Sequence, residues 1–165
     1  MLNAQELKAA LSDEIRIIRH LGTKLDSAKM DWRPTEGQRS TIELLRYMAL
    51  CGIAPVKAMA AGDWGVAKEM DKLVADMGLA DFDAAMASQE EALHTTLDDL
   101  GDAKLAEQMV KLPWGVTQPL GQAIFSTSLR FLCAYRLQLF LYAKQGGGND
   151  LSTFNAWMGS DPPKK

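Results

Sequence analysis

The fold is decided by the stretch TQPLGQAIFSTSLRFLCAYRLQLFLYAKQ, residues 117–145, which is the longest apolar run in the chain. Pro119 suits the first turn of a helix, because its missing N–H would lack a partner there. The residues GGGN at 146–149 supply a stop. Between residues 129 and 142, apolar side chains fall on nearly every side of a helical turn. The stretch therefore predicts a central helix that is buried on more than one face.

Polar side chains within this stretch decide between a bundle helix and a membrane span. A span becomes plausible at about 18 consecutive apolar residues. Four polar residues interrupt the run, namely Ser126, Arg130, Arg136 and Gln138. We therefore expect a helix in the interior of a bundle, and no membrane partner.

Length, composition and charge set the broad class of the protein. A chain of 165 residues can bury roughly 70% of its unfolded surface around one core. We expect a single domain over residues 1–165, with the tail from 149 to 165 partly mobile. Hydrophobic residues make up 47% of the chain and charged residues 24%, which is typical of globular proteins. The net charge of −3 lacks the basic excess of nucleic-acid-binding proteins, so we expect no nucleic-acid partner.

The N-terminus and the cysteines indicate the compartment. Residues 1–14, MLNAQELKAALSDE, contain acids and lack the apolar segment of a signal peptide. The two cysteines, Cys51 and Cys133, fall inside predicted helices and do not form a closely spaced framework. We expect a cytoplasmic protein in which both are reduced core thiols.

Helical periodicity recurs along most of the chain. Besides the helix at 117–145, the expected helices run over residues 3–27, 40–52, 63–78, 81–101 and 102–111. Their predicted N-terminal caps are Asn3, Ser40, Asp63 and Asp81, the first two followed three residues later by a glutamate. Gly52 and Pro55 are expected to kink or end the second helix. Four long helices and almost no period-two alternation predict an all-α antiparallel four-helix bundle with short extra helices in the connections.

Three segments in a fixed order carry a resemblance to a known family. They are DWRPTEGQRSTIELLRYM at 31–48, LPWGVTQPL at 112–120 and FLCAYRLQLFLYAKQGG at 131–147. Together they resemble the DinB-like (DNA-damage-inducible) family, which is related to thiol-dependent S-transferases and maleylpyruvate isomerase-type four-helix bundles. The resemblance covers roughly residues 5–148 and implies a DinB-like bundle.

The resemblance also implies a divalent metal held by three histidines, one on the second long helix and two at i and i+4 on the fourth. The matching positions here are Tyr47, Phe131 and Tyr135. Phe cannot hold a metal, and neutral Tyr is not a usual ligand for zinc, iron or nickel. We therefore expect no metal and no cofactor, and a pocket filled by aromatic rings. Cys51, one turn after Tyr47, is expected to face the same pocket, so the candidate ligand-binding residues are Tyr47, Cys51, Phe131 and Tyr135.

Other polar residues offer weaker candidate sites. A metal set of His20, His94 and Asp98 would need the first and third long helices to face each other, and we expect these histidines to be ordinary helix residues. Cys133 lies two residues from Tyr135 and points to another side of the helix. Four further side chains could line the mouth of the aromatic pocket and hold a carboxylate, or could be ordinary solvated charges: Arg39, Arg46, Arg136 and Gln138.

Two function classes remain open, and no catalytic residue is assigned. The favoured hypothesis is a DinB-like protein without the usual metal site that binds a small ligand or acts as an interaction protein. The apolar surface of residues 129–142 further suggests a homodimer. The alternative is a metal- or thiol-dependent hydrolase or S-transferase that uses an unrecognised metal set or a pocket of Tyr and Cys. Charge and motifs do not support a DNA-processing role.

Overall fold

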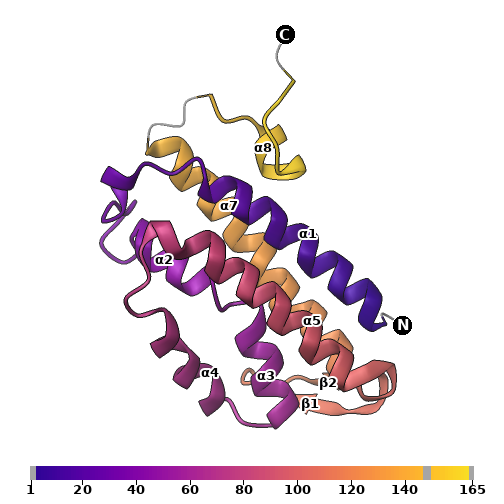
Figure 1. Ribbon diagram of the computed structural model, residues 1–165. Helices are drawn as coiled ribbons and strands as arrows, with labels where there is room; N and C mark the ends of the chain where they lie inside the picture. The colour runs from indigo at the N-terminus through magenta and orange to yellow at the C-terminus, as the bar shows by residue number, and fades with distance from the viewer. Residues whose placement is uncertain (1–2, 147–149, 164–165) are drawn as a thin grey trace.

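Four helical segments run alongside one another in the computed structural model, which describes residues 3–146 and 150–163 (Figure 1). They are α1 (Ala4–Gly22), α2 (Thr41–Met48) continued by α3 (Ile53–Ala61), α5 (Phe82–Glu107), and α6 (Leu120–Ile124) continued through a π-helical turn (Phe125–Leu129) into α7 (Arg130–Gln145). The first and fourth segments run in one direction, and the second and third run in the other. The predicted all-α four-helix bundle is therefore confirmed.

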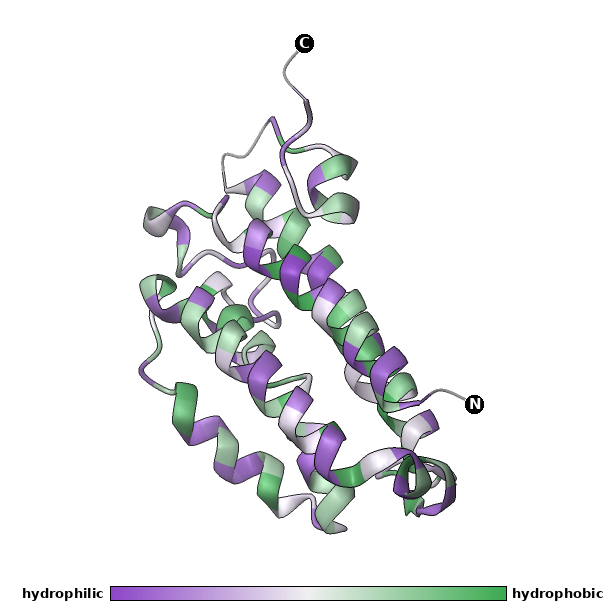
Figure 2. Ribbon diagram, turned by 45° about the vertical axis from the view of Figure 1, so that its right-hand side comes forward, coloured by the Kyte–Doolittle hydropathy of each residue, from purple (hydrophilic) through white to green (hydrophobic). Residues whose placement is uncertain are grey.

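Short elements occupy the connections and the segment after α7. They are α4 (Gly65–Met70), α8 (Thr153–Met158), 3-10 turns at Ser27–Lys29, Asp71–Val74 and Leu79–Asp81, and a hairpin of β1 (Met109–Lys111) and β2 (Thr117–Pro119). The long helices share one hydrophobic core. Hydropathy colouring shows green apolar and purple polar residues intermixed along α1 and α5 (Figure 2). Apolar residues that recur at three- and four-residue spacing give such a helix one face for the core and one for water.

The start of α1 follows from its capping box. The Asn3 side chain accepts from the backbone N–H of Glu6 at 2.8 Å, and the Glu6 carboxylate accepts from the N–H of Asn3 at 3.0 Å. The predicted end at Ser27 is wrong, because the helix stops at Gly22. A Cβ at Gly22 would lie 2.9 Å from the ring of Phe82, so the glycine lets α1 and α5 approach closely here. Asp26 then caps a separate 3-10 turn.

The second long helix is broken where the sequence predicts a kink. Ser40 and Glu43 form the expected capping box of α2, and α2 and α3 meet at 44°. A helix break leaves backbone N–H and C=O groups without partners. Here Gln89 of α5 satisfies them: its Oε1 accepts from the N–H groups of Gly52 at 2.8 Å and Ile53 at 3.2 Å, and its Nε2 donates to the carbonyl of Met48 at 3.0 Å.

Two predicted caps act differently from expectation. Asp81 precedes α5 without capping it, and its carboxylate instead accepts from the N–H of Gly78 at 2.9 Å. Asp63 accepts from the N–H of Gly65 at 2.7 Å, but the residue before α4 is Trp64. Both carboxylates therefore stabilise the turns around the helix starts.

The hairpin corrects the predicted helices at 102–111 and 117–145. After a kink at Gly101, where φ is +66°, α5 continues to Glu107. The chain then forms β1 and β2, joined by a turn with Gly115 at φ +92°. Pro119 ends β2 and directly precedes α6, so the fourth helix starts three residues later than predicted. Strands of three residues are too short to show a period-two pattern in the sequence.

The sequence predicts that the fourth long helix is buried on more than one face, but α7 has an exposed outer face. Leu132, Leu139 and Tyr142 are buried, whereas Leu137 is 57% and Leu141 48% exposed. The predicted stop at 146–149 lies outside the described residues except for Gly146, which follows the last helical residue.

One further finding concerns membrane spans. Within residues 3–146 and 150–163 no single helix is long and apolar enough to cross a bilayer, and the bent pair of α2 and α3 passes the criterion only when the two helices are taken together.

The Gln89 bridge predicts a large effect of one substitution. Gln89→Leu keeps the side-chain size but leaves the N–H groups of Gly52 and Ile53 buried without partners and removes the amide donor to the Met48 carbonyl. An unsatisfied buried polar group costs about 1–3 kcal/mol. We therefore expect a loss of about 3 kcal/mol in the free energy of unfolding, measured by urea denaturation followed by circular dichroism.

A matched control for this substitution is Gln122→Leu on α6, where the side chain is exposed. Its free energy of unfolding should stay within about 0.5 kcal/mol of the wild type. Equal stabilities of the two variants would contradict the structural role of Gln89.

Candidate functional site

The two tyrosines predicted to meet in the pocket are in contact. Tyr47 lies on the last turn of α2 and Tyr135 on α7, and their ring centroids are 4.7 Å apart at an interplanar angle of 61°. This edge-to-face geometry is favoured by the opposite charges of ring edge and ring face. The contact joins the second and fourth long helices at the place that the sequence resemblance predicts.

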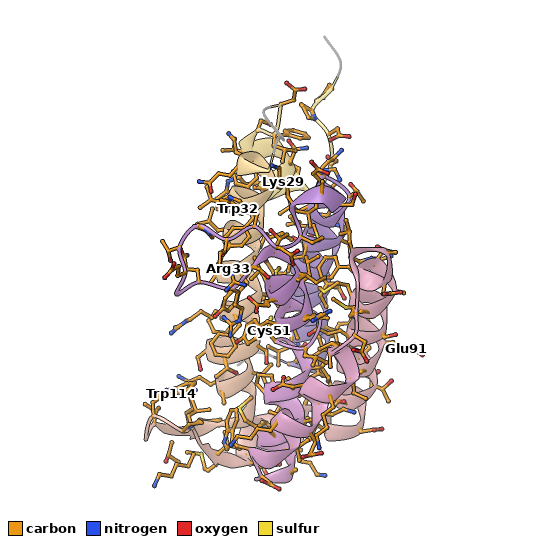
Figure 3. All side chains as sticks on the ribbon, turned by 90° about the vertical axis from the view of Figure 1, so that its left-hand side faces the viewer. Lys29, Trp32, Arg33, Cys51, Glu91 and Trp114 are labelled. Atoms are coloured by element: carbon orange, nitrogen blue, oxygen red, sulfur yellow. The ribbon has the colours of Figure 1, made fainter. Side chains whose placement is uncertain are left out.

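A pocket of about 220 Å³ opens beside this pair. Three of the four candidate residues line it: Tyr47, Cys51 and Phe131. Tyr135 stands behind Tyr47 and supports its ring. Cys51 lies in the middle of this face of the molecule, below the loop that carries Trp32 and Arg33 (Figure 3).

The other walls of the pocket come from α3 and from the segment containing α4. The additional lining residues are Leu50, Ala54, Pro55, Trp64, Ala67, Lys68 and Asp71. The interior is apolar, and the exposed Lys68 and Asp71 bring one charge of each sign to the rim. The sequence predicts a short helix after Asp63 but gives no signal that it covers the pocket, because its placement depends on the bend between α2 and α3.

Arg39 lies over the aromatic pair. Its guanidinium carbon is 4.1 Å from the ring centroid of Tyr47 and 5.9 Å from that of Tyr135. The backbone carbonyl of Arg39 accepts a 2.8 Å hydrogen bond from the hydroxyl of Tyr142 on α7. Trp32 packs edge-on against the Tyr142 ring with centroids 5.1 Å apart. Tyr142 therefore holds the loop that places a cation over the pocket's aromatic wall.

The other polar residues predicted at the pocket mouth have partners elsewhere. Arg46 donates from Nε to the carbonyl of Met77 at 2.9 Å, and Gln138 donates to the Tyr142 hydroxyl at 2.9 Å. Arg136 pairs with Glu14 of α1, with Nε 3.1 Å from the carboxylate. Arg39 is thus the member of the predicted set that contacts the aromatic pair.

Electrostatics keep the pocket residues neutral. Burial raises the pKa of the Cys51 thiol to about 12, with nearby Arg39 lowering it slightly. Burial likewise raises the pKa of Tyr47, and its neighbours Cys51 and Tyr135 raise it further. A thiolate is the reactive form of cysteine. At neutral pH the pocket therefore presents a protonated thiol and a protonated phenol.

The histidines belong to other parts of the bundle. Helices α1 and α5 do face each other, but His94 lies 2.8 Å from the Ser12 hydroxyl and Asp98 pairs with Lys8. His20 contacts the side chain of Asn155 at 3.2 Å. The His20, His94 and Asp98 set is therefore not assembled. In the described part of the chain, no three His, Cys, Asp or Glu side chains come together in a way that could hold a metal ion.

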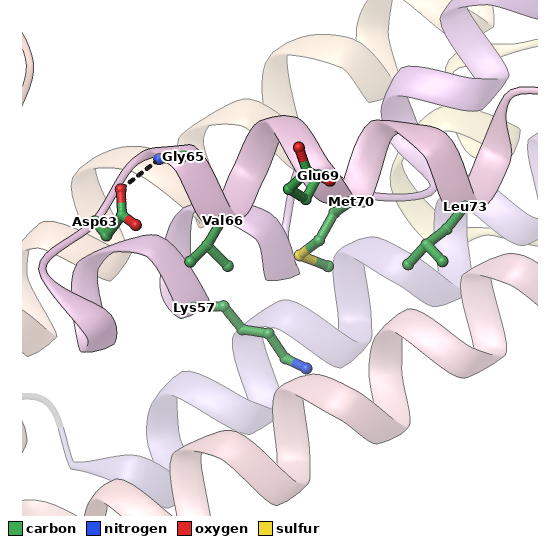
Figure 4. Close-up of a pocket in the computed structure, with 7 residues that line it drawn as sticks. All are labelled: Lys57, Asp63, Gly65, Val66, Glu69, Met70 and Leu73. Carbon is green, nitrogen blue, oxygen red and sulfur yellow. Dashed lines mark hydrogen bonds between the residues drawn. The ribbon is translucent and has the colours of Figure 1, made fainter.

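A more open cleft of about 610 Å³ lies between α3 and the α4 segment (Figure 4). Its lining includes Lys57, Glu69 and Leu73, all of which are exposed. The side chain of Leu73 is 76% exposed to solvent. This cleft would bury little of a ligand, so the site is better placed at the smaller aromatic pocket.

Comparison with solved structures identifies the class of fold. The DinB-like protein YjoA from Bacillus subtilis superposes with a TM-score of 0.71 and 14% sequence identity, covering 89% of this chain and 96% of that chain. The sibling lethal factor precursor DfsB superposes with a TM-score of 0.66 and 17% identity, covering 89% of this chain and 98% of that chain. No protein-family profile and no curated protein matches the sequence. The chain has a DinB-like fold, as the sequence resemblance predicts.

The state of the Cys51 thiol can be measured directly. In a Cys133→Ser variant, Cys51 is the remaining cysteine. Raising its pKa from 9.0 to about 12 lowers its thiolate fraction at pH 8 by about 10³-fold. We expect reaction with a thiol-specific disulfide reagent to be slower than that of the urea-unfolded variant by at least this factor. Rapid reaction with a midpoint near pH 8 would show an activated thiol instead.

The correspondence with the three-histidine site can be tested by building that site. The triple variant Tyr47→His, Phe131→His and Tyr135→His should bind zinc, because two imidazoles four residues apart on α7 would face a third from α2. Titration calorimetry should show binding at least tenfold tighter than in the double variant that retains Phe131. A folded triple variant without zinc affinity would refute the correspondence.

Proposed function

We propose that this DinB-like bundle binds a small, neutral, planar ligand in the pocket lined by Tyr47, Cys51 and Phe131. The observation that carries the proposal is the tyrosine pair beside a pocket of about 220 Å³ with an apolar interior. Drug-sized ligands occupy about 300–1,000 Å³. The pocket size therefore favours a compound with one or two fused rings.

The lining suggests how such a ligand would be held. The faces of Trp64 and Phe131 offer apolar contact, and the hydroxyl of Tyr47 can donate or accept one hydrogen bond. Lys68 and Asp71 at the rim provide a donor and an acceptor for a polar substituent that faces water. Arg39 over the Tyr47 ring fixes the orientation of that ring before a ligand arrives. Such preorganisation lowers the entropic cost of binding.

The alternative function, a metal- or thiol-dependent hydrolase or S-transferase, has less support. A thiol nucleophile needs a pKa lowered by neighbouring positive charge. The pKa of Cys51 is instead raised to about 12 by burial. Its thiol hydrogen faces the carbonyl of Met48, with the sulfur 3.7 Å from that oxygen.

Residues 129–142 expose less apolar surface for a homodimer interface than their sequence pattern predicts. Four of these side chains are buried, namely Leu132, Leu139, Phe140 and Tyr142, and most of the other apolar ones are partly buried. The outward-facing leucines are Leu137 and Leu141. A homodimer remains a prediction, and sedimentation equilibrium of the purified protein measures it.

A cavity-filling variant tests the binding proposal. Ala67→Trp places a large ring into the pocket, whereas Ala103→Trp adds the same ring to an exposed position on α5. We use indole as the probe and follow amide chemical shifts by NMR. Indole should bind the wild type and the Ala103→Trp variant at sub-millimolar concentration, while Ala67→Trp should lose at least tenfold in affinity. Indole binding that Ala67→Trp leaves unchanged would refute the proposal.

A further inference from the structure

A second cleft, of about 410 Å³, lies on the other side of α7, between that helix and α8. Its apolar lining comes from Ala134, Leu137, Phe140, Ala156 and Trp157. Trp157 is 66% and Leu137 57% exposed, so two large apolar side chains face solvent at the opening. An apolar surface of this kind is stabilised when a ligand covers it.

Two arginines give this cleft its charge. Arg136 is largely buried, with 12% of its side chain exposed, and pairs with Glu14, which is 13% exposed. The pair cancels its own charge. Arg130, one to two turns earlier on α7, also lines the cleft and is exposed. Within the described residues it forms no ion pair, so the cleft as a whole carries one uncompensated positive charge while the chain carries −3.

The buried ion pair also shapes the wall of the cleft. The guanidinium carbon of Arg136 lies 5.0 Å from the ring centroid of Trp157, so the arginine holds the aromatic ring of α8 toward α7. The Nε of Arg136 lies 3.1 Å from the Glu14 carboxylate, and within the described residues its terminal nitrogens form no hydrogen bond. A guanidinium offers five N–H donors in a fixed fork, which suits a planar carboxylate.

Cys133 contributes a neutral surface at this point. Burial, followed by the nearby Glu14 carboxylate, raises the pKa of its thiol to about 11. The thiol therefore stays protonated at neutral pH and adds no negative charge that would repel an anion.

Helix α8 is held in place by contacts remote from the cleft. Arg16 of α1 donates to the carbonyl of Met158 at 2.8 Å. Asn155 is 1% exposed and donates to Asp161 at 2.9 Å, and Asp161 in turn pairs with Lys24 of α1 at 2.7 Å. The wall that carries Trp157 is thus fixed to the bundle, and the cleft exists before a ligand enters.

We propose that the cleft between α7 and α8 is a second binding site, which takes an amphipathic monoanion with a flat apolar body and a carboxylate. The apolar body lies between Leu137 and Trp157, and the carboxylate contacts Arg130 and the terminal nitrogens of Arg136. This site is separate from the aromatic pocket, which lies on the face of α7 that carries Phe131 and Tyr135.

A pair of probes with the same shape and different charge tests the proposal. 2-Naphthoate carries a carboxylate and 2-naphthamide carries a neutral amide. By titration calorimetry on the full chain carrying Ala67→Trp, which fills the aromatic pocket, 2-naphthoate should bind about tenfold more tightly than 2-naphthamide, as expected for one charge-assisted contact. Arg130→Gln should reduce this preference to about twofold or less. Lys104→Gln on exposed α5 removes the same charge elsewhere and should leave the preference unchanged.

A blocking variant separates this cleft from the aromatic pocket. Ala134→Trp fills the α7–α8 cleft and should abolish binding of 2-naphthoate, whereas Ala67→Trp fills the other pocket and should leave 2-naphthoate affinity within about twofold of the wild type. Circular dichroism confirms that each variant is folded. The proposal is overturned if 2-naphthoate fails to bind at about 5 mM, a concentration that detects even millimolar affinity. It is also overturned if both probes bind equally or if Ala134→Trp has no effect. Sedimentation that shows a second copy of the chain covering the cleft would overturn it as well.

Discussion

The break between α2 and α3 depends on one side chain, Gln89. A glutamine amide carries both an acceptor and a donor. It can therefore hydrogen-bond the unpaired carbonyl at the end of one helix and the unpaired N–H groups at the start of the next. Its oxygen serves the N–H groups of Gly52 and Ile53, and its nitrogen serves the carbonyl of Met48. A Cβ at Gly52 would lie 2.9 Å from this oxygen, so the glycine is what allows the amide to reach the backbone. An apolar residue at position 89 would leave these groups unpaired at a cost comparable to much of a domain's stability.

The aromatic pocket is a consequence of this break. Up to Met48, α2 packs against α7 and places Tyr47 on Tyr135. Beyond the break, α3 turns through 44° and packs on α4, α5, α6 and the π-helical turn. The pocket lies beside Phe131 and is lined on another side by Trp64, the residue before α4.

Local signals in the sequence account for the helix starts, the break and the tyrosine pair. Asn3 and Ser40 form capping boxes with residues three positions later. Gly52 and the nearby Pro55 indicate the helix break in the sequence. The pairing of Tyr47 with Tyr135 required the sequence resemblance as well, because 88 positions separate them (135 − 47). The hairpin, α8 and the α4 roof could not be predicted, since each depends on contacts between distant segments. The Arg136–Glu14 ion pair is of the same kind: sequence alone makes Arg136 as plausible at the pocket mouth as in the core.

The π-helical turn at Phe125–Leu129 sets the rotation of α7 about its axis relative to α6. A π turn adds about one residue to a helical turn, and one residue corresponds to about 100° of rotation. All of α7 is therefore rotated relative to α6 compared with an uninterrupted helix. With this rotation Phe131 faces α2, and Cys133, about 200° around the helix from it, lines the cleft beside α8. Residues 129–142, which are apolar on nearly every side, lie almost entirely within α7, so the π turn does not account for that pattern. The structure resolves this apolar surface into a core-facing stripe and two concave faces, and the separation of the two binding sites that we propose follows from the angle between Phe131 and Cys133 within α7.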